Sequence, residues 1–243
     1  MDFINVKGIV TKEVNTGETD KYIDLFTDKL GKITIYVKGA KSKKSCLNST
    51  QILNYCDYVL YKRMDKYYIS SCELIESFYQ IRCDVTYLTY ATHFLDIINS
   101  VICENQSQIA LLRLLLNTLY ILSKGKKDPK FINVVFELRL LKILGYQPYI
   151  KDCIRCNKDF EVMYFDFLQS GLICENCKIG DAFKLQNGTK KALNFIMSVS
   201  NEKIFKFKLS ESCLDELDRF TRIYLKEKLE REYNKLDFLS YIN

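Results

Sequence analysis

The chain of 243 residues has no tryptophan, a single histidine, 2 prolines and 9 glycines. Collagen-like and proline-rich chains contain far more glycine and proline, so both classes are excluded. Long apolar runs are also missing. The longest, residues 109–122, is interrupted by Arg113 and Asn117, whereas a membrane-spanning helix needs about 20 predominantly apolar residues. The N-terminus carries an early acid, Asp2, and no apolar core of an export signal. We therefore expect a cytoplasmic protein.

The motifs of common catalytic sites are missing as well. The sequence contains no GxSxG, HExxH or GxGxxG pattern, which would mark a hydrolase nucleophile, a zinc protease or a dinucleotide-binding loop. The single histidine, His93, has no partner at the spacing of a catalytic triad or a metal site. We therefore expect a protein that is not an enzyme.

The overall composition is that of a globular chain. Hydrophobic residues make up 48% of the sequence, enough to bury a sizeable core, and charged residues make up 27%. There are 36 Lys and Arg against 30 Asp and Glu, which gives a net charge of +6. This mildly basic balance permits a nucleic-acid partner without requiring one.

The first 80 residues have the pattern of a small β-barrel. Strands are predicted over residues 3–14, 21–27, 32–38, 51–62 and 66–78. The clearest is 32–38, where Ile33, Ile35 and Val37 alternate with polar residues, as in a half-buried strand. Such a set of strands without a helical segment predicts a five-stranded OB-fold. A five-stranded SH3-like barrel fits the pattern almost as well.

The remainder of the chain has helical periodicity. Helices are predicted over residues 84–104, 106–124, 131–144, 190–199 and 212–230, the last with Ser212 and Asp215 as a capping box. The expected fold is therefore α+β and multidomain. An OB-fold domain, residues 1–80, precedes a helical domain, residues 81–243, into which a metal-binding module, residues 149–182, is inserted.

The cysteines of this module are the strongest motif in the sequence. Ten cysteines are present, and four of them form two CxxC pairs, Cys153 with Cys156 and Cys174 with Cys177. Two such turns can bring four sulfurs around one zinc ion, and with four protein ligands no position remains for substrate. The spacing therefore predicts one structural Zn²⁺ per chain. A redox pair, a disulfide and an iron–sulfur cluster remain as alternatives.

A lysine-rich segment lies on the predicted barrel. Residues 29–45 contain six lysines and no acid. Lys32, Tyr36 and Lys38 share the outward face of the strand at 32–38, and the loop that follows contains Lys41, Lys43 and Lys44. Proteins that bind single strands combine cations for phosphates with aromatic rings for bases, and OB-folds use this region. A solvated lysine face with a flexible loop is the alternative.

Two blocks of sequence resemble one known family, the bacterial recombination mediators of the RecO type. The first block resembles the N-terminal OB domain of that family, and the second its helical domain with both cysteine pairs. The matching segments are Lys7-Gly8-Ile9-Val10, Gly17-Glu18-Thr19-Asp20-Lys21, Leu30-Gly31-Lys32, Lys38-Gly39-Ala40-Lys41, Phe136-Glu137-Leu138-Arg139-Leu140-Leu141, Gly145-Tyr146, Pro148, Cys153-Ile154-Arg155-Cys156 and Ser170-Gly171-Leu172-Ile173-Cys174. Asn157 stands where many members have glycine.

The resemblance implies a non-enzymatic DNA repair protein associated with the nucleoid. Such a protein binds single- and double-stranded DNA, anneals complementary strands, and contacts the C-terminal tail of the single-strand binding protein SSB. Together with RecR it helps to load RecA on SSB-coated strands. The resemblance also implies the four cysteines as metal ligands. The DNA-contact residues that it implies are Lys7, Lys21, Lys32, Lys38 and Lys41, to which the surface pattern adds Tyr36, Lys43 and Lys44.

Two other classes of function remain open at this stage. A protein-interaction adaptor could use the barrel and the zinc module to dock other proteins without binding nucleic acid. A zinc-dependent or redox enzyme is disfavoured, because the sequence offers no histidine ligands and the four cysteines would close the metal shell.

Overall fold

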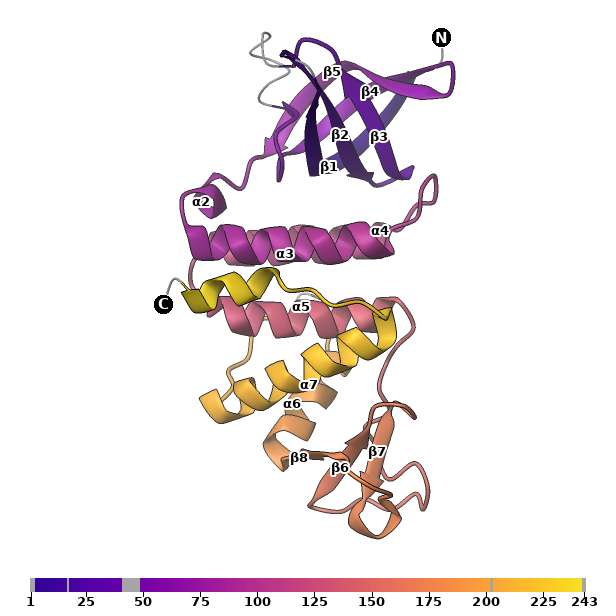
Figure 1. The fold of residues 1–243 in the computed structure, drawn as a ribbon, viewed down its shortest axis with the longest axis vertical. Helices are drawn as coiled ribbons and strands as arrows, with labels where there is room; N and C mark the ends of the chain where they lie inside the picture. Colours follow the sequence, from indigo (N-terminus) through magenta and orange to yellow (C-terminus); the bar gives the residue numbers. More distant parts are fainter. Residues whose placement is uncertain (1–2, 17, 41–48, 202, 242–243) are drawn as a thin grey trace. The chain divides into compact units, whose positions relative to one another are not determined.

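The computed structural model describes residues 3–16, 18–40, 49–201 and 203–241 (Figure 1). It divides into two compact units. The first consists of Met1–Ser123 with Phe238–Asn243, and the second is Lys124–Asp237. The expected boundary near residue 80 marks the change from strands to helices in the sequence. The first unit also includes the helices that directly follow that boundary.

In the described part of the first unit, five strands close into a barrel: β1 (Phe3–Thr16), β2 (Asp20–Thr27), β3 (Gly31–Val37), β4 (Tyr55–Arg63) and β5 (Lys66–Glu76). Their order is β1-β2-β3-β5-β4, and the pairing of β4 with β1 closes the barrel. Every pairing is antiparallel except that of β3 with β5. The predicted OB-fold is confirmed.

The barrel core follows the alternation read from the sequence. Ile33, Ile35 and Val37 of β3 are buried, and they meet Ile23 and Leu25 of β2 inside the barrel. β1 is long enough to pair with β4 along its first half and with β2 along its second half. A bulge between Val10 and Lys12 bends the strand between these two partners, as bulges do where a strand turns a corner.

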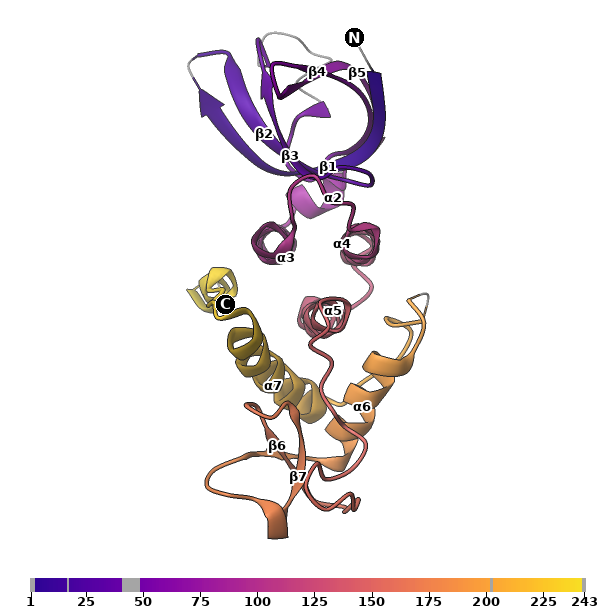
Figure 2. The same cartoon turned by 90° about the vertical axis from the view of Figure 1, so that its right-hand side faces the viewer.

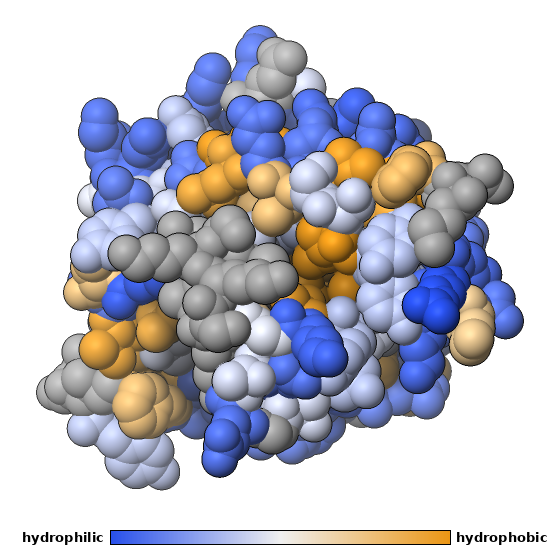
Figure 3. Space-filling view, turned by 90° about the horizontal axis from the view of Figure 1, so that it is seen from above, coloured by the Kyte–Doolittle hydropathy of each residue, from blue (hydrophilic) through white to orange (hydrophobic). Residues whose placement is uncertain are grey.

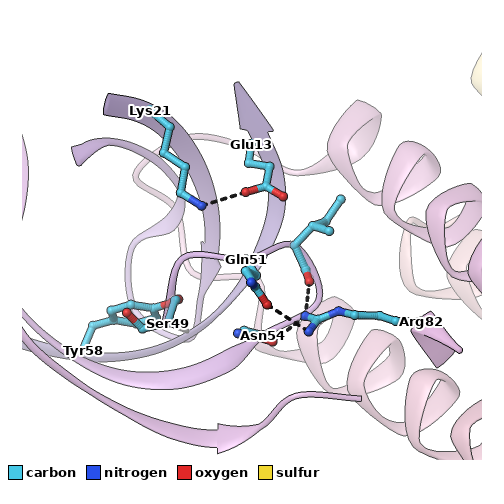
Figure 4. A network of polar contacts seen from close by, with 8 residues as sticks. Glu13, Lys21, Ser49, Gln51, Asn54, Tyr58 and Arg82 are labelled. Atoms are coloured by element: carbon cyan, nitrogen blue, oxygen red, sulfur yellow. Dashed lines mark hydrogen bonds and ion pairs between the residues drawn. The ribbon is translucent and has the colours of Figure 1, made fainter. Parts of the chain in front are cut away.

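Three helices follow the barrel within the first unit: α2 (Tyr79–Arg82), α3 (Val85–Val101) and α4 (Ile109–Ser123). α3 and α4 lie side by side beneath the barrel (Figure 2). The Asp84 side chain caps α3 by accepting a hydrogen bond from the Tyr87 backbone N–H at 2.9 Å. Arg82 joins this region to the barrel, because its guanidinium donates to Asn54 Oδ1 and to the Ile52 carbonyl, both at 2.5 Å (Figure 4).

Gly31 shows how closely the β2–β3 turn approaches the loop between α3 and α4. Its φ is +61°, a conformation that favours glycine. A Cβ atom here would lie 2.3 Å from the Gln106 carbonyl oxygen and 2.5 Å from that of Cys103. The Lys32 N–H donates to the same Cys103 carbonyl at 3.1 Å. The barrel and these helices are therefore fixed to each other by backbone contacts.

The second unit combines helices with a small sheet. Its elements are α5 (Pro129–Ile143), β6 (Met163–Asp166), β7 (Gly171–Cys174), the 3₁₀ turn η1 (Glu175–Cys177), β8 (Phe183–Leu185), α6 (Asn187–Ser198) and α7 (Glu211–Leu229). The 3₁₀ helix η2 (Lys235–Tyr241) follows α7, and from Phe238 on it belongs to the first unit. α5 is buried along most of its length between α6 and α7. The predicted cap of α7 at Ser212 is wrong. The hydroxyl of Ser210 accepts from the Cys213 N–H at 3.3 Å, so the helix begins earlier.

Within the described residues, none of the helices combines the length and the apolar character needed to span a bilayer.

Candidate metal centre and nucleic-acid interface

Four cysteines converge in the second unit. The sulfurs of Cys153, Cys156, Cys174 and Cys177 all lie within 4.8 Å of one another. The Sγ atoms of Cys156 and Cys174 are 3.8 Å apart. A tetrahedral ion with metal–sulfur bonds of about 2.3 Å has sulfur–sulfur edges of about 3.8 Å, so this spacing fits a four-thiolate metal site. No cysteine in the described part of the chain is in a disulfide.

The backbone holds each cysteine pair in a tight turn. The Asn157 N–H donates to the Cys153 carbonyl at 2.8 Å, and the Lys178 N–H donates to the Cys174 carbonyl at 3.0 Å. Asn157 adopts a φ of +55°, a region that asparagine enters more readily than most residues. An asparagine at position 157 is therefore compatible with this turn.

The thiols of the site differ in their affinity for protons. Burial would raise the pKa of Cys153, but the backbone N–H groups of Cys156, Arg155 and Cys174 outweigh burial and lower that pKa to about 6. The pKa of Cys177 is raised to about 12, first by its hydrogen bond with Cys174 and then by burial. Metal ions bind thiolates rather than thiols, so Cys153 is preorganised as a ligand.

The three-stranded sheet connects this site to the helices. β6 pairs with both β7, which ends at Cys174, and β8. From β6, the ring of Phe165 packs edge-on against Phe220 and Tyr224 of α7, with centroid separations of 4.8 and 5.6 Å. The cysteine turns are therefore anchored on the helical core, and a metal ion here would stabilise one edge of that unit.

The residues expected to contact DNA differ in their exposure to solvent. Lys7 on β1 and Lys38 directly after β3 are exposed. Lys32 is half-buried and lies 3.6 Å from a carboxylate oxygen of Asp24. Lys41, Lys43 and Lys44 lie outside the described residues.

Lys21 has a structural environment. It is 4% exposed, and its amino group donates to the Glu13 carboxylate at 2.7 Å near one end of the barrel (Figure 4). This placement differs from the one that the resemblance implies, because a buried, paired amino group is not available to a phosphate on the outer surface. The strand pattern explains the difference, since Lys21 alternates with the outward residues Asp20 and Tyr22.

Residues 29–45 contain no acid in the sequence, but two acids of the neighbouring strand lie beside this segment in the structure. Asp20 and Asp24 of β2 lie next to the outward side chains of β3. The Thr34 hydroxyl donates to Asp24 at 2.7 Å, the Gly39 N–H donates to Asp20 at 2.7 Å, and the Tyr36 hydroxyl also donates to Asp20. The bond from Gly39 first, and then that from Tyr36, hold the pKa of Asp20 below its usual range. Sequence reasoning missed the two acids because they belong to the neighbouring strand.

Tyr36 was the one aromatic residue that sequence reasoning placed on this face, together with Lys32 and Lys38. The structure adds Tyr22, which pairs directly with Tyr36 across β2 and β3 and lies with its ring centroid 5.2 Å away. Tyr22 is 41% exposed. The outer barrel surface therefore combines aromatic rings with exposed cations, the two groups that single-strand binders use.

Comparison with known proteins finds a matching family model for each half of the chain. The family model described as "Recombination protein O N terminal" matches residues 1–78, and that described as "Recombination protein O C terminal" matches residues 82–237. The chain belongs to the RecO family. Proteins named "DNA repair protein RecO" are 47% identical in Acetivibrio thermocellus, over 100% of this chain and 98% of that protein, and 33% identical in Caldicellulosiruptor bescii, over 100% of both. RecO membership supports a role in DNA repair.

Proposed function

We propose that this chain is a non-enzymatic recombination mediator in DNA repair. It binds single- and double-stranded DNA through the barrel, anneals complementary strands, and helps to load RecA on SSB-coated single strands together with RecR. The observation that carries the proposal is the outer barrel surface, where exposed Lys7 and Lys38 accompany Tyr22 and Tyr36 in a chain of the RecO family. The runner-up is an adaptor that docks proteins and binds no nucleic acid.

The lysines proposed to contact DNA fall into three groups. Lys7 and Lys38 are free to approach phosphates, while Lys32 first has to leave Asp24. Lys41, Lys43 and Lys44 remain predicted contacts from the sequence pattern. Each phosphate that is neutralised on a single strand contributes about −0.7 to the slope of log affinity against log salt concentration. Binding therefore weakens steeply with salt.

We propose zinc as the ion held by Cys153, Cys156, Cys174 and Cys177. Four thiolates at tetrahedral spacing suit Zn²⁺ and close its shell, so the ion would hold the two cysteine turns together and take no part in a reaction. Metal analysis of the purified chain should find one zinc per molecule. Visible absorbance from iron in place of zinc would favour the iron–sulfur alternative.

We also propose two protein partners, which the resemblance to the RecO family implies. RecR and the C-terminal tail of SSB are proposed partners, and no residue of this chain is assigned to either of them.

The test is annealing of two complementary oligonucleotides, naked or coated with SSB from the same organism. Acceleration of the coated strands supports a mediator that contacts both DNA and SSB. Acceleration of naked strands alone supports the barrel assignment and argues against the SSB contact. If the chain accelerates neither reaction and binds no oligonucleotide at low salt, the adaptor replaces the mediator. Addition of RecR to each reaction tests whether that partner is required.

A further inference from the structure

We propose that a row of aromatic side chains, which crosses every strand of the barrel, is a stacking surface for unpaired bases of single-stranded DNA. The row consists of Tyr22 on β2, Tyr36 on β3, Tyr68 on β5, Tyr61 on β4 and Phe3 on β1. This inference rests on the proposed DNA binding and deepens it, because it names the residues that would recognise bases and the kind of strand they accept.

The strand register brings these side chains to one level. Tyr22 pairs with Tyr36, Tyr61 pairs with Tyr68, and Phe3 pairs with Tyr61. The parallel contact of β3 with β5 aligns Ile35 with Tyr67, which places Tyr36 beside Tyr68, one residue further along both strands. Residues far apart in the sequence thus form one continuous line across the strands.

All members of the row point away from the barrel core. Each of them follows or precedes a residue that packs inside: Ile4, Ile23, Ile35, Leu60 and Tyr67 belong to the core or pack against it. Because side chains alternate along a strand, the aromatic neighbours face outward. Phe3 is 59% exposed and Tyr22 41% exposed. The barrel core therefore does not account for these rings.

The rings already contact one another as stacking groups do. Tyr61 and Tyr68 are stacked, with centroids 5.3 Å apart and planes inclined by 17°. Tyr22 and Tyr36 are tilted by 49° at 5.2 Å, and Phe3 meets the edge of Tyr61 at 6.4 Å. Such mutual contacts fix the rings in place, so little freedom is lost when a base stacks on an exposed face.

Cations lie on the outward face along both edges of the row. Arg63 and Lys66 pair with each other two residues beyond Tyr61 and Tyr68, and therefore share their face. Lys38 lies two residues beyond Tyr36. All three are exposed, and none of them forms an ion pair with any described residue. Rings for bases with cations for phosphates is the combination found in channels for single strands.

The occupant of this surface is a single strand rather than a duplex. Bases inside a duplex stack on each other and do not present a free face to a ring, whereas the phosphates of both forms are accessible. Figure 3 shows the molecule from above the barrel, where some apolar residues lie open among hydrophilic ones. The surface thus offers both kinds of contact that an unpaired strand needs.

The first experiment compares binding of an oligothymidine and of a duplex at one salt concentration by fluorescence anisotropy. Tyr22→Leu and Tyr68→Leu should each weaken oligothymidine binding, by about 5- to 150-fold for a base that loses its stacking partner. Duplex binding should stay unchanged. Tyr241→Leu is the matched control, because Tyr241 is 85% exposed and lies outside the row. An abasic oligonucleotide should bind the wild type and both variants equally.

A second measurement does not depend on loss of binding. The chain has no tryptophan, so Tyr22→Trp introduces a single indole into the row and Tyr241→Trp introduces one outside it. Oligothymidine should quench the indole fluorescence of Tyr22→Trp and leave that of Tyr241→Trp unchanged. Circular dichroism checks that each variant is folded.

The outcomes separate this inference from the proposed function. If the wild type binds no oligonucleotide at low salt, the proposed DNA binding fails, and the row fails with it. If the wild type binds but folded Tyr22→Leu and Tyr68→Leu bind oligothymidine equally well, only the row is overturned. Equal losses for oligothymidine and duplex, or an unquenched Tyr22→Trp, would overturn it as well.

Discussion

The Sγ atom of Cys156 lies 3.8 Å from that of Cys174, although the two residues are 18 positions apart in the sequence. This distance is the sulfur–sulfur edge expected around one tetrahedral zinc ion. Removal of the proposed zinc ion should therefore destabilise the second unit. A chelator is expected to lower its midpoint of thermal unfolding, and Cys156→Ser should do the same without chelator. Structural zinc in small peptides contributes about 10–16 kcal/mol of apparent binding energy, much of it coupled to folding.

The control for this prediction is Cys83→Ser. Cys83 is an exposed free thiol on the first unit, so its loss should change neither the zinc content nor the unfolding midpoint. Zinc content and midpoint that are unchanged in Cys156→Ser would show that the four cysteines do not hold a structural ion.

The lysines of the barrel should separate into contacts and structural residues. Lys7 and Lys38 are exposed, so Lys7→Glu and Lys38→Glu should each reduce the salt slope of single-strand binding by about 0.7 or more. Lys21→Met should leave that slope unchanged. It should instead lower the free energy of unfolding by about 1–3 kcal/mol, because the partly buried ion pair with Glu13 is lost. Urea denaturation and a salt titration of oligonucleotide binding measure the two effects. A reduced slope in Lys21→Met, without a loss of stability, would return Lys21 to the DNA surface.

The carboxylate of Asp20 should make stability depend on pH at the acid end. Its pKa in the folded chain lies below the usual range, because the Gly39 N–H and then the Tyr36 hydroxyl bond to the charged form. A depressed pKa stabilises the fold above the ordinary pKa of about 4 and loses that contribution as the pH falls through the lowered value. Asp20→Asn should therefore be less stable than the wild type near neutral pH, and the difference should shrink on acidification. Urea denaturation from pH 7 to about pH 3 checks this, and Tyr36→Phe, which removes one donor, should show a smaller effect. A difference that stays constant over this range would contradict the assignment.

Local patterns could be predicted from the sequence, and relations between distant strands could not. The alternation around Ile35 predicted the buried face of β3, and the spacing from Cys153 to Cys177 predicted the convergence of the four cysteines. Asp20 and Asp24 were missed as partners of the lysine face, because their position depends on the pairing of β2 with β3.

The aromatic row illustrates the same limit more clearly. It requires that β5 lies between β3 and β4, so that Tyr68 stands between Tyr36 and Tyr61. No periodicity within a single strand encodes that order. Likewise, both Ser210 and Ser212 are good capping residues by type, and only the hydrogen bond from Cys213 to Ser210 decides where α7 begins.

Arg139 should hold the C-terminal end of α6 in place. The residue is 7% exposed, and its guanidinium donates to the carbonyls of Ile196 and Val199 at 3.0 Å each and also to the Asn201 side chain. The last carbonyls of a helix have no partner within the helix, and a planar fork can satisfy more than one of them at once. Arg139→Lys keeps the charge but loses the fork, so it should lower the free energy of unfolding by about 2–4 kcal/mol. Hydrogen exchange of the α6 amides should become faster in this variant. Lys191→Met, on an exposed position of the same helix, should leave both unchanged, and equal protection of α6 in Arg139→Lys and the wild type would show that the fork is dispensable.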